Sequence, residues 1–231
     1  MPVTLSSFST TPNGFSAEQI ELFRNADIMF CETKPTVDFV MGELGVDTSN
    51  KKMFYVAETL DSGSVQVDLQ TSMAYIENNI DKNIVIISDD GFPNIVDPYG
   101  GLIRYLVAKN IHIGITPNTS SLLSAIVLSG ITSDMFFFGG VIVKWEDYSK
   151  KIQSLKTISQ EMPIILFIVI PDLEWAKVVF SEIADIFGGD RWATILHSMG
   201  KPSAKTYRCR ASELYDKHKM HFPEPFTLVL H

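Results

Sequence analysis

The sequence has few of the features that a disulfide-bonded, zinc-binding or membrane-spanning protein requires. Its 231 residues include only two cysteines, Cys31 and Cys209, and no Cys or His spacing typical of zinc sites surrounds them. The longest apolar run, Ile164 to Ile170, is far shorter than the roughly 20 residues that span a bilayer. Residues 1–5 lack the charged n-region of a signal peptide. We therefore expect a soluble, cytoplasmic protein.

Basic residues are also in the minority, with 19 Lys and Arg against 27 Asp and Glu and a net charge of −8. This excess of acid argues against a protein that coats nucleic acid or binds anionic membranes, but it leaves room for a local basic groove. The sequence contains neither a Gly-x-Gly-x-x-Gly after its first expected strand nor a Walker-type Gly-Lys-Ser/Thr. Both familiar phosphate-binding loops are therefore missing, which argues against nucleotide hydrolysis and NAD chemistry.

Short strands alternate with amphipathic helices along the whole sequence, which is typical of α/β proteins with mainly parallel or mixed sheets. We expect strands at 3–8, 27–31, 52–56, 84–88, 111–116, 135–143, 164–170, 192–197, 206–210 and 226–230. We expect helices at 16–25, 35–45, 65–80, 97–110, 120–129, 173–187 and 212–218. The composition changes near Thr116-Pro117, which predicts two α/β domains, 1–116 and 117–231. The charged segment 144–160 is predicted to be a flexible lid or linker.

Helical spacing also predicts which side chains face the core. In the helix at 97–110 these are Leu102, Ile103, Leu106 and Val107. In the helix at 173–187 they form a stripe that comprises Trp175, Val178, Val179, Ile183 and Phe187.

We expect structural rather than catalytic or metal-binding roles for His197, His218, His221 and Cys31. His197 follows an apolar strand and is expected to be a satisfied structural histidine. His218 and His221 lie three residues apart among lysines, which disfavours a metal pair and favours a solvated face. Cys31 ends an apolar strand and is expected to behave as a small apolar residue.

Three segments are rich in glycine, proline and small polar residues: 88–98 and 117–121 directly follow expected strands, and 138–140 lies within the expected strand 135–143. Ligands of parallel sheets bind beyond the carboxyl ends of the strands, and loops after neighbouring strands converge there. The three segments together therefore predict a ligand site. Any one of them alone is explained as well by turns and helix caps, with Asp97 and either Thr119 or Ser120 as N-caps.

The first of these segments carries a resemblance to a known family. Residues 86–100, IISDDGFPNIVDPYG, resemble the VSDAGTPxISDPG segment of the tetrapyrrole (corrin/porphyrin) methylase superfamily. They are most similar to the branch that 2′-O-methylates a cytidine of small-subunit ribosomal RNA. Weaker matches follow in order over nearly the whole chain, at 26–28 (ADI), 32–33 (ET), 117–121 (PNTSS), 128–136 (LSGITSDMF), 138–140 (FGG), 207–214 (YRCRASEL) and 225–230 (PFTLVL).

The resemblance implies a two-domain α/β methyltransferase, usually a homodimer, that binds S-adenosylmethionine in the cleft between its halves and O-methylates ribosomal RNA. It assigns no metal. The cofactor contacts that it implies are Ser88, Asp89, Asp90, Gly91, Pro93, Asp97, Pro117, Thr119, Ser120, Ser121, Phe138, Gly139, Ile170, Pro171, Phe226 and Thr227.

Methyl transfer from a sulfonium is an in-line displacement, so the main task of the protein is to align donor and acceptor and to exclude water. A general base is useful when the acceptor is an alcohol. Asp89 and Asp90 are the predicted catalytic residues. Asp97 and Glu32 lie in the same loops, but a helix cap and a solvated carboxylate after a strand explain these two better. No carboxylate pattern supports a dedicated Mg²⁺ site.

The sequence departs from the ribosomal branch at positions suited to phosphate contact. Residues 11–14 retain only part of its VATPIGN motif, and the Arg of its YESPHR and ARELTK motifs is absent from 168–173 and 196–201, where only Lys201 is basic. A methylase of a tetrapyrrole or another metabolite, and a degenerate relative that acts as a binding module, therefore remain open. The basic residues of the second half fit either an RNA-facing side or a charged lid with an exposed edge strand; they are Lys144, Lys150, Lys151, Lys156, Lys201, Lys205, Arg208 and Arg210.

Overall fold

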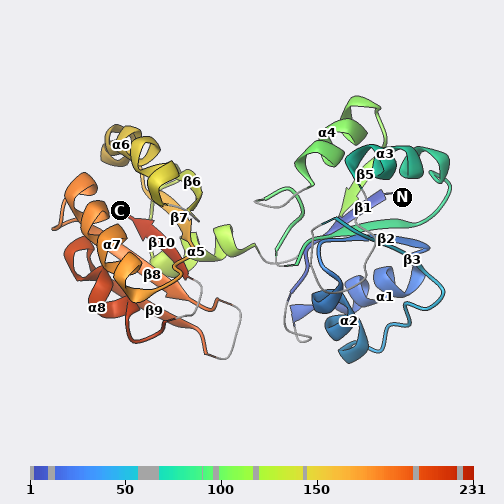
Figure 1. Ribbon diagram of the computed structural model, residues 1–231, viewed down its shortest axis with the longest axis horizontal. Helices are drawn as coiled ribbons and strands as arrows, with labels where there is room; N and C mark the ends of the chain where they lie inside the picture. The colour runs from blue at the N-terminus through green and yellow to red at the C-terminus, as the bar shows by residue number, and fades with distance from the viewer. Residues whose placement is uncertain are drawn as a thin grey trace. The chain divides into compact units, whose positions relative to one another are not determined.

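The computed structural model (Figure 1) describes residues 3–9, 14–56, 68–89, 91–95, 99–116, 120–142, 145–199, 203–222 and 226–231. The chain divides into two compact units, Met1–Ser120 (unit 1) and Ser121–His231 (unit 2). The sequence places its predicted boundary slightly earlier, after Thr116. Each unit is built on one β-sheet with helices packed against it. The predicted α/β class, with a mainly parallel or mixed sheet in each half, is confirmed.

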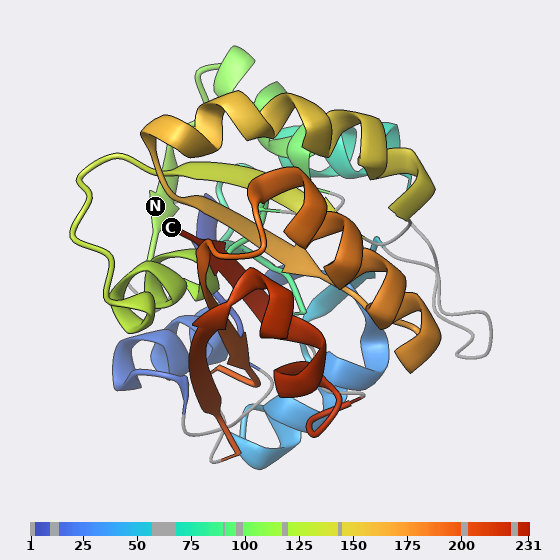
Figure 2. The same ribbon diagram turned by 90° about the vertical axis from the view of Figure 1, so that its left-hand side faces the viewer.

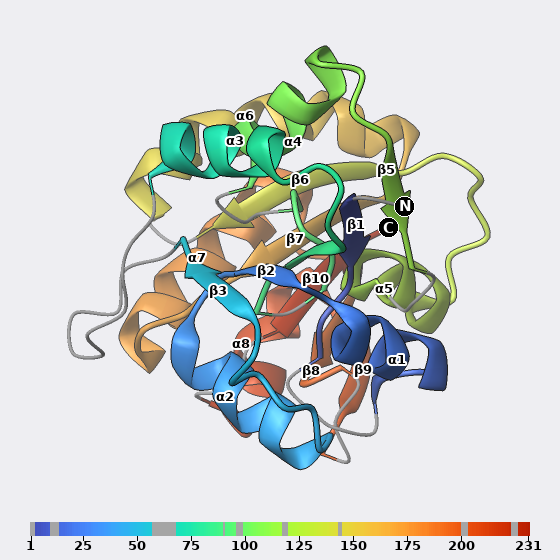
Figure 3. The ribbon, with the colours of Figure 1, turned by 90° about the vertical axis from the view of Figure 1, so that its right-hand side faces the viewer.

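The described strands of unit 1 form one parallel sheet. They are β1 (Val3–Ser6), β2 (Ile28–Cys31), β3 (Lys52–Tyr55), β4 (Ile84–Ile87) and β5 (Ile113–Ile115), in the order β3-β2-β4-β1-β5. Every residue of β2 and β4 is buried, as is typical of parallel strands that are covered on both faces. Helices α1 (Ala17–Asn25) and α2 (Lys34–Glu43) pack on one face, and α3 (Leu69–Asn78) and α4 (Gly100–Ala108) pack on the other (Figure 3).

Local signals set the ends of α1 and α2 close to the expected ranges 16–25 and 35–45. The amide of Gln19 donates to Ser16 Oγ at 3.2 Å, and the amide of Ser16 donates to Gln19 Oε1 at 3.1 Å, which makes a capping box. Pro35 lies in the first turn of α2. Beyond its end, Gly45 adopts a φ of +62°, a backbone conformation that glycine adopts without strain.

Two helices of unit 1 begin later than the sequence predicts. Helix α3 begins at Leu69, because Asp68 has extended dihedrals and its carboxylate accepts from the amide of Thr71 at 2.9 Å. Tyr99 occupies the N-cap position of α4. The predicted helical residues 65–67 and 97–98 lie outside the described residues.

Val107 was expected to face the core but is 62% exposed, so this prediction is wrong. The buried stripe of α4 is centred on Leu102 and Leu106. Val107 follows Leu106 by one residue, a rotation of about 100° around the helix, which takes it beyond the edge of that stripe.

Unit 2 has a mixed sheet with the order β6-β7-β10-β8-β9. Its strands are β6 (Phe137–Ile142), β7 (Ile164–Ile168), β8 (Trp192–His197), β9 (Lys205–Arg210) and β10 (Phe226–Leu230). Strands β6 and β7 are parallel, whereas β10 pairs antiparallel with both β7 and β8, and β9 pairs antiparallel with β8. The strand that comes last in the chain therefore lies in the middle of the sheet.

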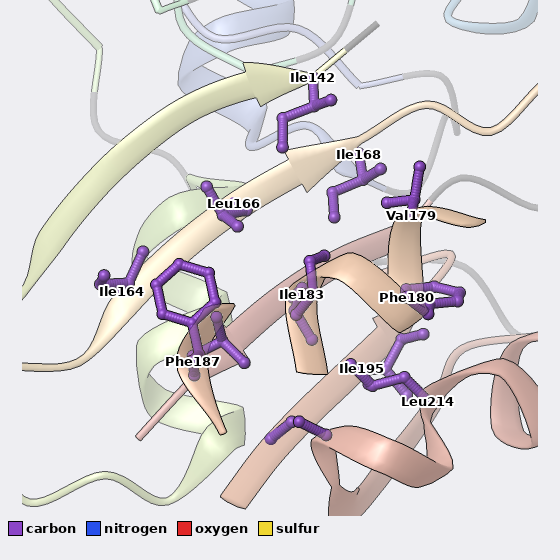
Figure 4. Close-up of a cluster of buried hydrophobic side chains, with 14 of the residues drawn as sticks. Ile142, Ile164, Leu166, Ile168, Val179, Phe180, Ile183, Phe187, Ile195 and Leu214 are labelled. Carbon is purple, nitrogen blue, oxygen red and sulfur yellow. The ribbon is translucent and has the colours of Figure 1, made fainter. Parts of the chain in front are cut away.

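Most of the unit 2 core lies under one face of this sheet. Helices α6 (Trp145–Glu161), α7 (Leu173–Phe187) and α8 (Leu214–His218) pack there and lie in front of the sheet in Figure 2. Figure 4 shows side chains of α7 facing those of β7, among them Ile183 and Leu166. Helix α5 (Ser121–Ser129) packs on the opposite face, where Ala125 contacts a smaller cluster with Ile165 and Val229.

The segment at 144–160 is not a flexible lid or linker, so this prediction is wrong. Residues 145–160 belong to α6, whose Ile152, Leu155 and Ser159 are buried. These side chains recur every three or four residues, which gives the charged helix one face that packs onto β6, β7 and α7. In α7, Val178 is 53% exposed, so its prediction as a core residue is wrong. The buried centre of α7 is formed by Ala176, Val179 and Ile183.

Residues 138–140 are also not a loop. They lie within β6, where the pairing with β7 shifts between Phe138 and Val141, and Gly140 adopts a φ of +91°. This irregularity explains the glycine pair, because a bulge bends a strand and favours a residue without a side chain.

In the part of the chain that the structure describes, no helix combines the length and apolar character needed to cross a membrane.

The packing around Gly139 yields a stability prediction. A Cβ at this position would lie 2.6 Å from Leu166 Cδ2 and 3.1 Å from Leu155 Cδ1. Gly139→Ala is therefore expected to lower the free energy of unfolding of unit 2 by about 1–3 kcal/mol through overpacking. All three tryptophans belong to unit 2, so their fluorescence during urea unfolding reports on this unit.

Gly189→Ala is the matched control. A Cβ there would make only an ordinary contact, 3.5 Å from Ser212 Cβ, and we expect an unchanged or slightly higher unfolding midpoint. Equal midpoints for the parent and Gly139→Ala would contradict the packing argument.

Candidate functional site

The carboxyl ends of the strands of unit 1 share one edge of the sheet, because the strands are parallel. At this edge, the Ser6 hydroxyl oxygen accepts from Thr116 Oγ1 at 2.9 Å and from Gln19 Nε2 at 3.1 Å. The same Gln19 amide group donates to the carbonyl oxygen of Ser7 at 3.1 Å. Side chains from β1, α1 and the end of β5 therefore form one buried polar network.

Backbone pairing fixes the loop after β4 against the end of β1. Phe8 and Gly91 exchange two hydrogen bonds of 2.8 and 2.9 Å, and the Ser88 hydroxyl donates to the Gly91 carbonyl at 3.0 Å. Gly91 has a φ of +81°, and no described atom lies within 4 Å of the place where a Cβ would be. The conformation thus favours glycine, and no described atom crowds this side of the backbone.

A second contact joins the same loop to α2. The Asp89 carboxylate accepts from the Thr33 amide at 3.1 Å, from the Thr33 hydroxyl at 2.6 Å and from the Thr36 hydroxyl at 3.2 Å. The Asp89 amide in turn donates to Glu32 Oε2 at 2.9 Å. The expectation of a merely solvated Glu32 is therefore wrong, because its carboxylate helps to hold the loop.

Cys31 lies beneath this contact and is fully buried. Burial, followed by the negative charges of Asp89 and Asp38, raises the pKa of its thiol well above the ordinary value. The thiol therefore stays protonated and packs as a small apolar group, as the sequence predicts.

The structure brings together part of the predicted set in unit 1. Ser88, Asp89, Gly91 and Pro93 all lie on the loop after β4, with Ser88 and Pro93 buried. Ser120 is half-buried beyond the end of β5, and Ser121 is the first residue of α5. Strand β1 lies between β4 and β5, so these two loops do not follow adjacent strands. The remaining predicted residues of this half, Asp90, Asp97, Pro117 and Thr119, lie outside the described residues.

Sequence reasoning missed Ser6, Ser7 and Thr116. Ser7 Oγ is buried and has no hydrogen-bond partner among the described residues. The available signal was the change from apolar to polar residues at the ends of β1 and β5. A groove of about 600 Å³ also lies within unit 1, between α1 and the sheet, and its lining includes Thr4, Glu18, Ile115 and Thr116.

In unit 2 the predicted residues divide between the two faces of the sheet. Phe138 lies on the α5 side, where its ring meets that of Phe167 with centroids 5.0 Å apart. Thr227 alternates with Phe226 along β10, is 4% exposed and pairs with Phe167 and Leu196 in register. Thr227 and Phe138 are therefore the members of the set on the α5 side.

The other predicted residues of unit 2 lie elsewhere. A Cβ at Gly139 would point toward Leu155 and Leu166 in the main core. Phe226 packs in the main core against Phe180, with ring centroids 5.6 Å apart. Ile170 packs at the edge of that core, and Pro171 is exposed just before the N-cap of α7. Packing therefore explains the sizes of Gly139 and Phe226.

Three histidines stack beside Phe226, which the sequence did not predict. The His197 ring lies 5.3 Å from that of His218 and 4.8 Å from that of His221. His221 Nε2 lies 2.6 Å from the Tyr207 hydroxyl oxygen, a hydrogen-bond distance. His218 is 1% exposed rather than solvated, so the prediction for this residue is wrong. The cause is tertiary, because the rings of Phe180 and Phe226 cover His218.

No group of three or more His, Cys, Asp or Glu side chains is arranged to bind a metal ion within the described ranges.

The Asp89 contact yields a local-stability prediction. Asp89→Asn replaces a carboxylate that accepts three hydrogen bonds with a neutral amide, and hydrogen bonds to charged groups contribute about 1.5–3 kcal/mol each. We expect amide hydrogen exchange at Thr33 to become about 10–100-fold faster. Asp38→Asn is the control, because Asp38 pairs with Lys34 on the exposed side of the same helix. If both variants exchange at the parental rate, Asp89 does not hold α2.

The histidine cluster yields a pH prediction. Burial, followed by the nearby His221, lowers the pKa of His218 from 6.5 to about 4. The unfolded chain binds this proton more readily than the folded one, so the stability of unit 2 falls as the pH decreases from about 6.5 to about 4. Tryptophan fluorescence in urea at a series of pH values measures this slope.

His218→Phe is expected to flatten the slope but not to abolish it, because burial also lowers the pKa of His231. His112→Gln, on the exposed surface of unit 1, should leave the slope of unit 2 as it is. An unchanged slope in His218→Phe would contradict the assignment.

Comparison with known proteins places this geometry in a family. The family model for Tetrapyrrole (Corrin/Porphyrin) Methylases matches residues 11–215. The chain is similar to "Ribosomal RNA small subunit methyltransferase I" of Thermotoga maritima, with 31% identity over 134 residues, which is 57% of each chain. It is similar to the protein of the same name from Mesomycoplasma conjunctivae, with 28% identity over 191 residues, 77% of this chain and 74% of that one. The match thus spans little more than half of the Thermotoga maritima protein.

Solved structures with the same fold have low sequence identity. The methyltransferase CobJ superposes with a TM-score of 0.64 at 13% identity, covering 98% of this chain and 92% of that one. Diphthine synthase superposes with a TM-score of 0.63 at 16% identity, covering 99% and 88%. Since the family model matches nearly the whole chain and the fold agrees, the protein belongs to the tetrapyrrole (corrin/porphyrin) methylase family.

Proposed function

We propose that the protein is an S-adenosylmethionine-dependent methyltransferase that O-methylates ribosomal RNA. The observation that carries this proposal is the family match over residues 11–215, together with relatives from two bacteria that are named for methylation of small-subunit ribosomal RNA. The likeness to a uroporphyrin-III C-methyltransferase complexed with S-adenosyl homocysteine supports the cofactor, with a TM-score of 0.60 at 12% identity and coverage of 99% and 95%.

The residues of unit 1 fit this cofactor. It carries a cationic sulfonium, an amino-acid zwitterion and a nucleoside, so it needs neutral hydrogen-bonding groups and carboxylates rather than a phosphate-binding loop. Ser7 Oγ supplies a buried polar atom without a partner among the described residues, and Gly91 leaves room for close approach to its backbone. When bound, S-adenosylmethionine supplies an electrophilic methyl group.

The proposed cofactor contacts come from both units. Unit 1 supplies the loop after β4 with Ser88, Gly91 and Pro93, and unit 2 supplies Phe138 and Thr227 from the α5 side of its sheet. We retain the remaining implied contacts in the proposal, namely Asp89, Asp90, Asp97, Pro117, Thr119, Ser120, Ser121, Gly139, Ile170, Pro171 and Phe226.

The two predicted catalytic aspartates receive different roles in this proposal. The Asp89 carboxylate already accepts three hydrogen bonds from the start of α2, so it positions the loop. Asp90 is the proposed base that accepts the proton of the ribose 2′-hydroxyl group. Alignment of the acceptor and exclusion of water contribute more than the base, up to about 7–11 kcal/mol in well-oriented systems.

A methyl-label transfer assay on cell extract, separated into RNA, protein and small-molecule fractions, tests the proposal. We expect label in small-subunit ribosomal RNA, and a decrease of kcat by about 10²–10⁴-fold in Asp90→Asn, because that variant removes the base. Asp81→Asn, an exposed carboxylate next to Lys82, is the control and should retain the parental rate.

Label in the small-molecule fraction alone would favour a metabolite methylase and overturn the RNA assignment. No label in any fraction would favour a binding module. The homodimer that the resemblance implies is part of the proposal, and static light scattering of the intact chain tests it.

A further inference from the structure

Three of the five arginines of the chain lie around one tryptophan in unit 2. Arg191 precedes Trp192 at the start of β8, and Arg208 and Arg210 lie at the end of β9. The guanidinium carbon of Arg210 lies 3.8 Å from the centroid of the Trp192 ring, and that of Arg208 lies 4.6 Å from it. We call Trp192, Arg208 and Arg210 the Trp–Arg patch.

The strand register places the whole patch on one face of the sheet. Trp192 pairs with Arg210, and Thr194 pairs with Arg208. Directly opposed residues of antiparallel strands project to the same side, and so do residues two apart on one strand. Trp192 is 38% exposed and Arg208 is exposed, so solvent reaches the patch.

The arginines of the patch have no carboxylate partner among the described residues. Arg210 Nη1 donates to the backbone carbonyl of Asp190 at 2.5 Å, and the carboxylate of Glu213 accepts from the backbone amide of Arg210 at 2.8 Å. Behind the patch, Arg191 donates to the carbonyl of Ser159 in α6. No ion pair in the described ranges contains any of these arginines. The patch is thus a concentration of positive charge in a chain of net charge −8.

Burial and the positive charges of two of these arginines lower the pKa of a neighbouring histidine, His231. The pKa of His231 lies below its ordinary value, first because of burial and then because of the positive charges of Arg208 and Arg191. His231 follows β10, and its amide donates to the Trp192 carbonyl at 2.9 Å. The positive field therefore extends from β9 across β8 to the end of β10.

The chemistry of the patch suits a nucleic-acid backbone. Stacking on an indole holds a guanidinium plane in place, so less conformational freedom is lost when its N–H groups bind phosphate oxygens. Unpaired bases stack on aromatic rings and on guanidinium planes, and the patch supplies both. An acidic peptide would use the charge of the arginines but would make no use of the stacking surface.

The patch lies on the same face of the sheet as a proposed cofactor contact. Thr194 is opposite Arg208, Leu196 is opposite Thr227, and Thr194 and Leu196 project to one side of β8. Two strand spacings and two residues separate Arg208 from Thr227, a distance of about 12 Å between their backbones. Helix α5 packs on the same face and Thr227 is 4% exposed, so the patch lies at the edge of the face that α5 covers.

We propose that the Trp–Arg patch binds the phosphate backbone of the single-stranded RNA that carries the methyl acceptor. This inference rests on the proposed function and adds to it the surface that holds the acceptor.

The binding of a fluorescently labelled single-stranded RNA of about 12 nucleotides to the intact chain tests it, measured by anisotropy at several salt concentrations. Each phosphate contact contributes about −0.7 to the slope of log K against log salt. The double variant Arg208→Gln/Arg210→Gln is expected to reduce the magnitude of this slope by about 1.4 and to weaken binding about 25-fold at 0.1 M salt.

The control is Arg24→Gln/Arg104→Gln, which removes the same charge from two exposed arginines of unit 1. It should keep the parental slope. Trp192→Leu should weaken binding with less change of slope, because it removes the aromatic stacking surface but no charge. Equal affinities and slopes in the parent and the Arg208/Arg210 variant would overturn the proposal, as would an absence of RNA binding by the parent at low salt.

Calorimetry with S-adenosylhomocysteine on the same samples separates this inference from the proposed function. If the parent binds S-adenosylhomocysteine and the Arg208/Arg210 variant binds RNA as tightly as the parent, only the proposal for the patch is overturned. If the parent does not bind S-adenosylhomocysteine, the proposed function itself is overturned. Binding of polyglutamate, but not RNA, would assign the patch to an acidic protein and would also overturn the proposal.

Discussion

The parallel register of the first sheet is the constraint on which the proposed site depends. It brings the carboxyl ends of β1, β2, β4 and β5 to one edge, and it places the central strand β1 next to β4. The two hydrogen bonds between Phe8 and Gly91 are possible only because these two chain ends leave the sheet side by side. The polar network around Ser6 and the contact of Asp89 with α2 then fix the loops on either side.

The second sheet follows a different rule, because its last strand in sequence is central and antiparallel to its neighbours. Its two faces differ in composition. One carries the main core and the stacked histidines. The other carries α5, Phe138, Thr227 and the Trp–Arg patch. Alternation along β10 therefore places Phe226 in the main core and Thr227 on the α5 face.

Features set by neighbours in sequence were predictable, and features set by distant packing were not. The Ser16–Gln19 capping box, the positive φ of Gly45 after α2, and the bounds of β8 follow from local residues. The segment 144–160 was misassigned because its many charges concealed a stripe of buried residues in α6. The burial of His218 and the bond from Asp89 to Glu32 depend on elements far apart in sequence, which no local pattern records. The resemblance located the loop after β4 but could not separate cofactor contacts from residues such as Gly139, whose size is fixed by packing.

The central proposal is that the loop after β4 in unit 1 binds S-adenosylmethionine. Hydrogen exchange of the intact chain, measured by mass spectrometry with and without S-adenosylhomocysteine, tests it most directly. The account predicts slower exchange on ligand addition in residues 88–95 of unit 1 and in residues 136–142 of unit 2, where β6 is an edge strand with amides that are not all paired. Unchanged exchange in residues 88–95 on ligand addition would contradict it.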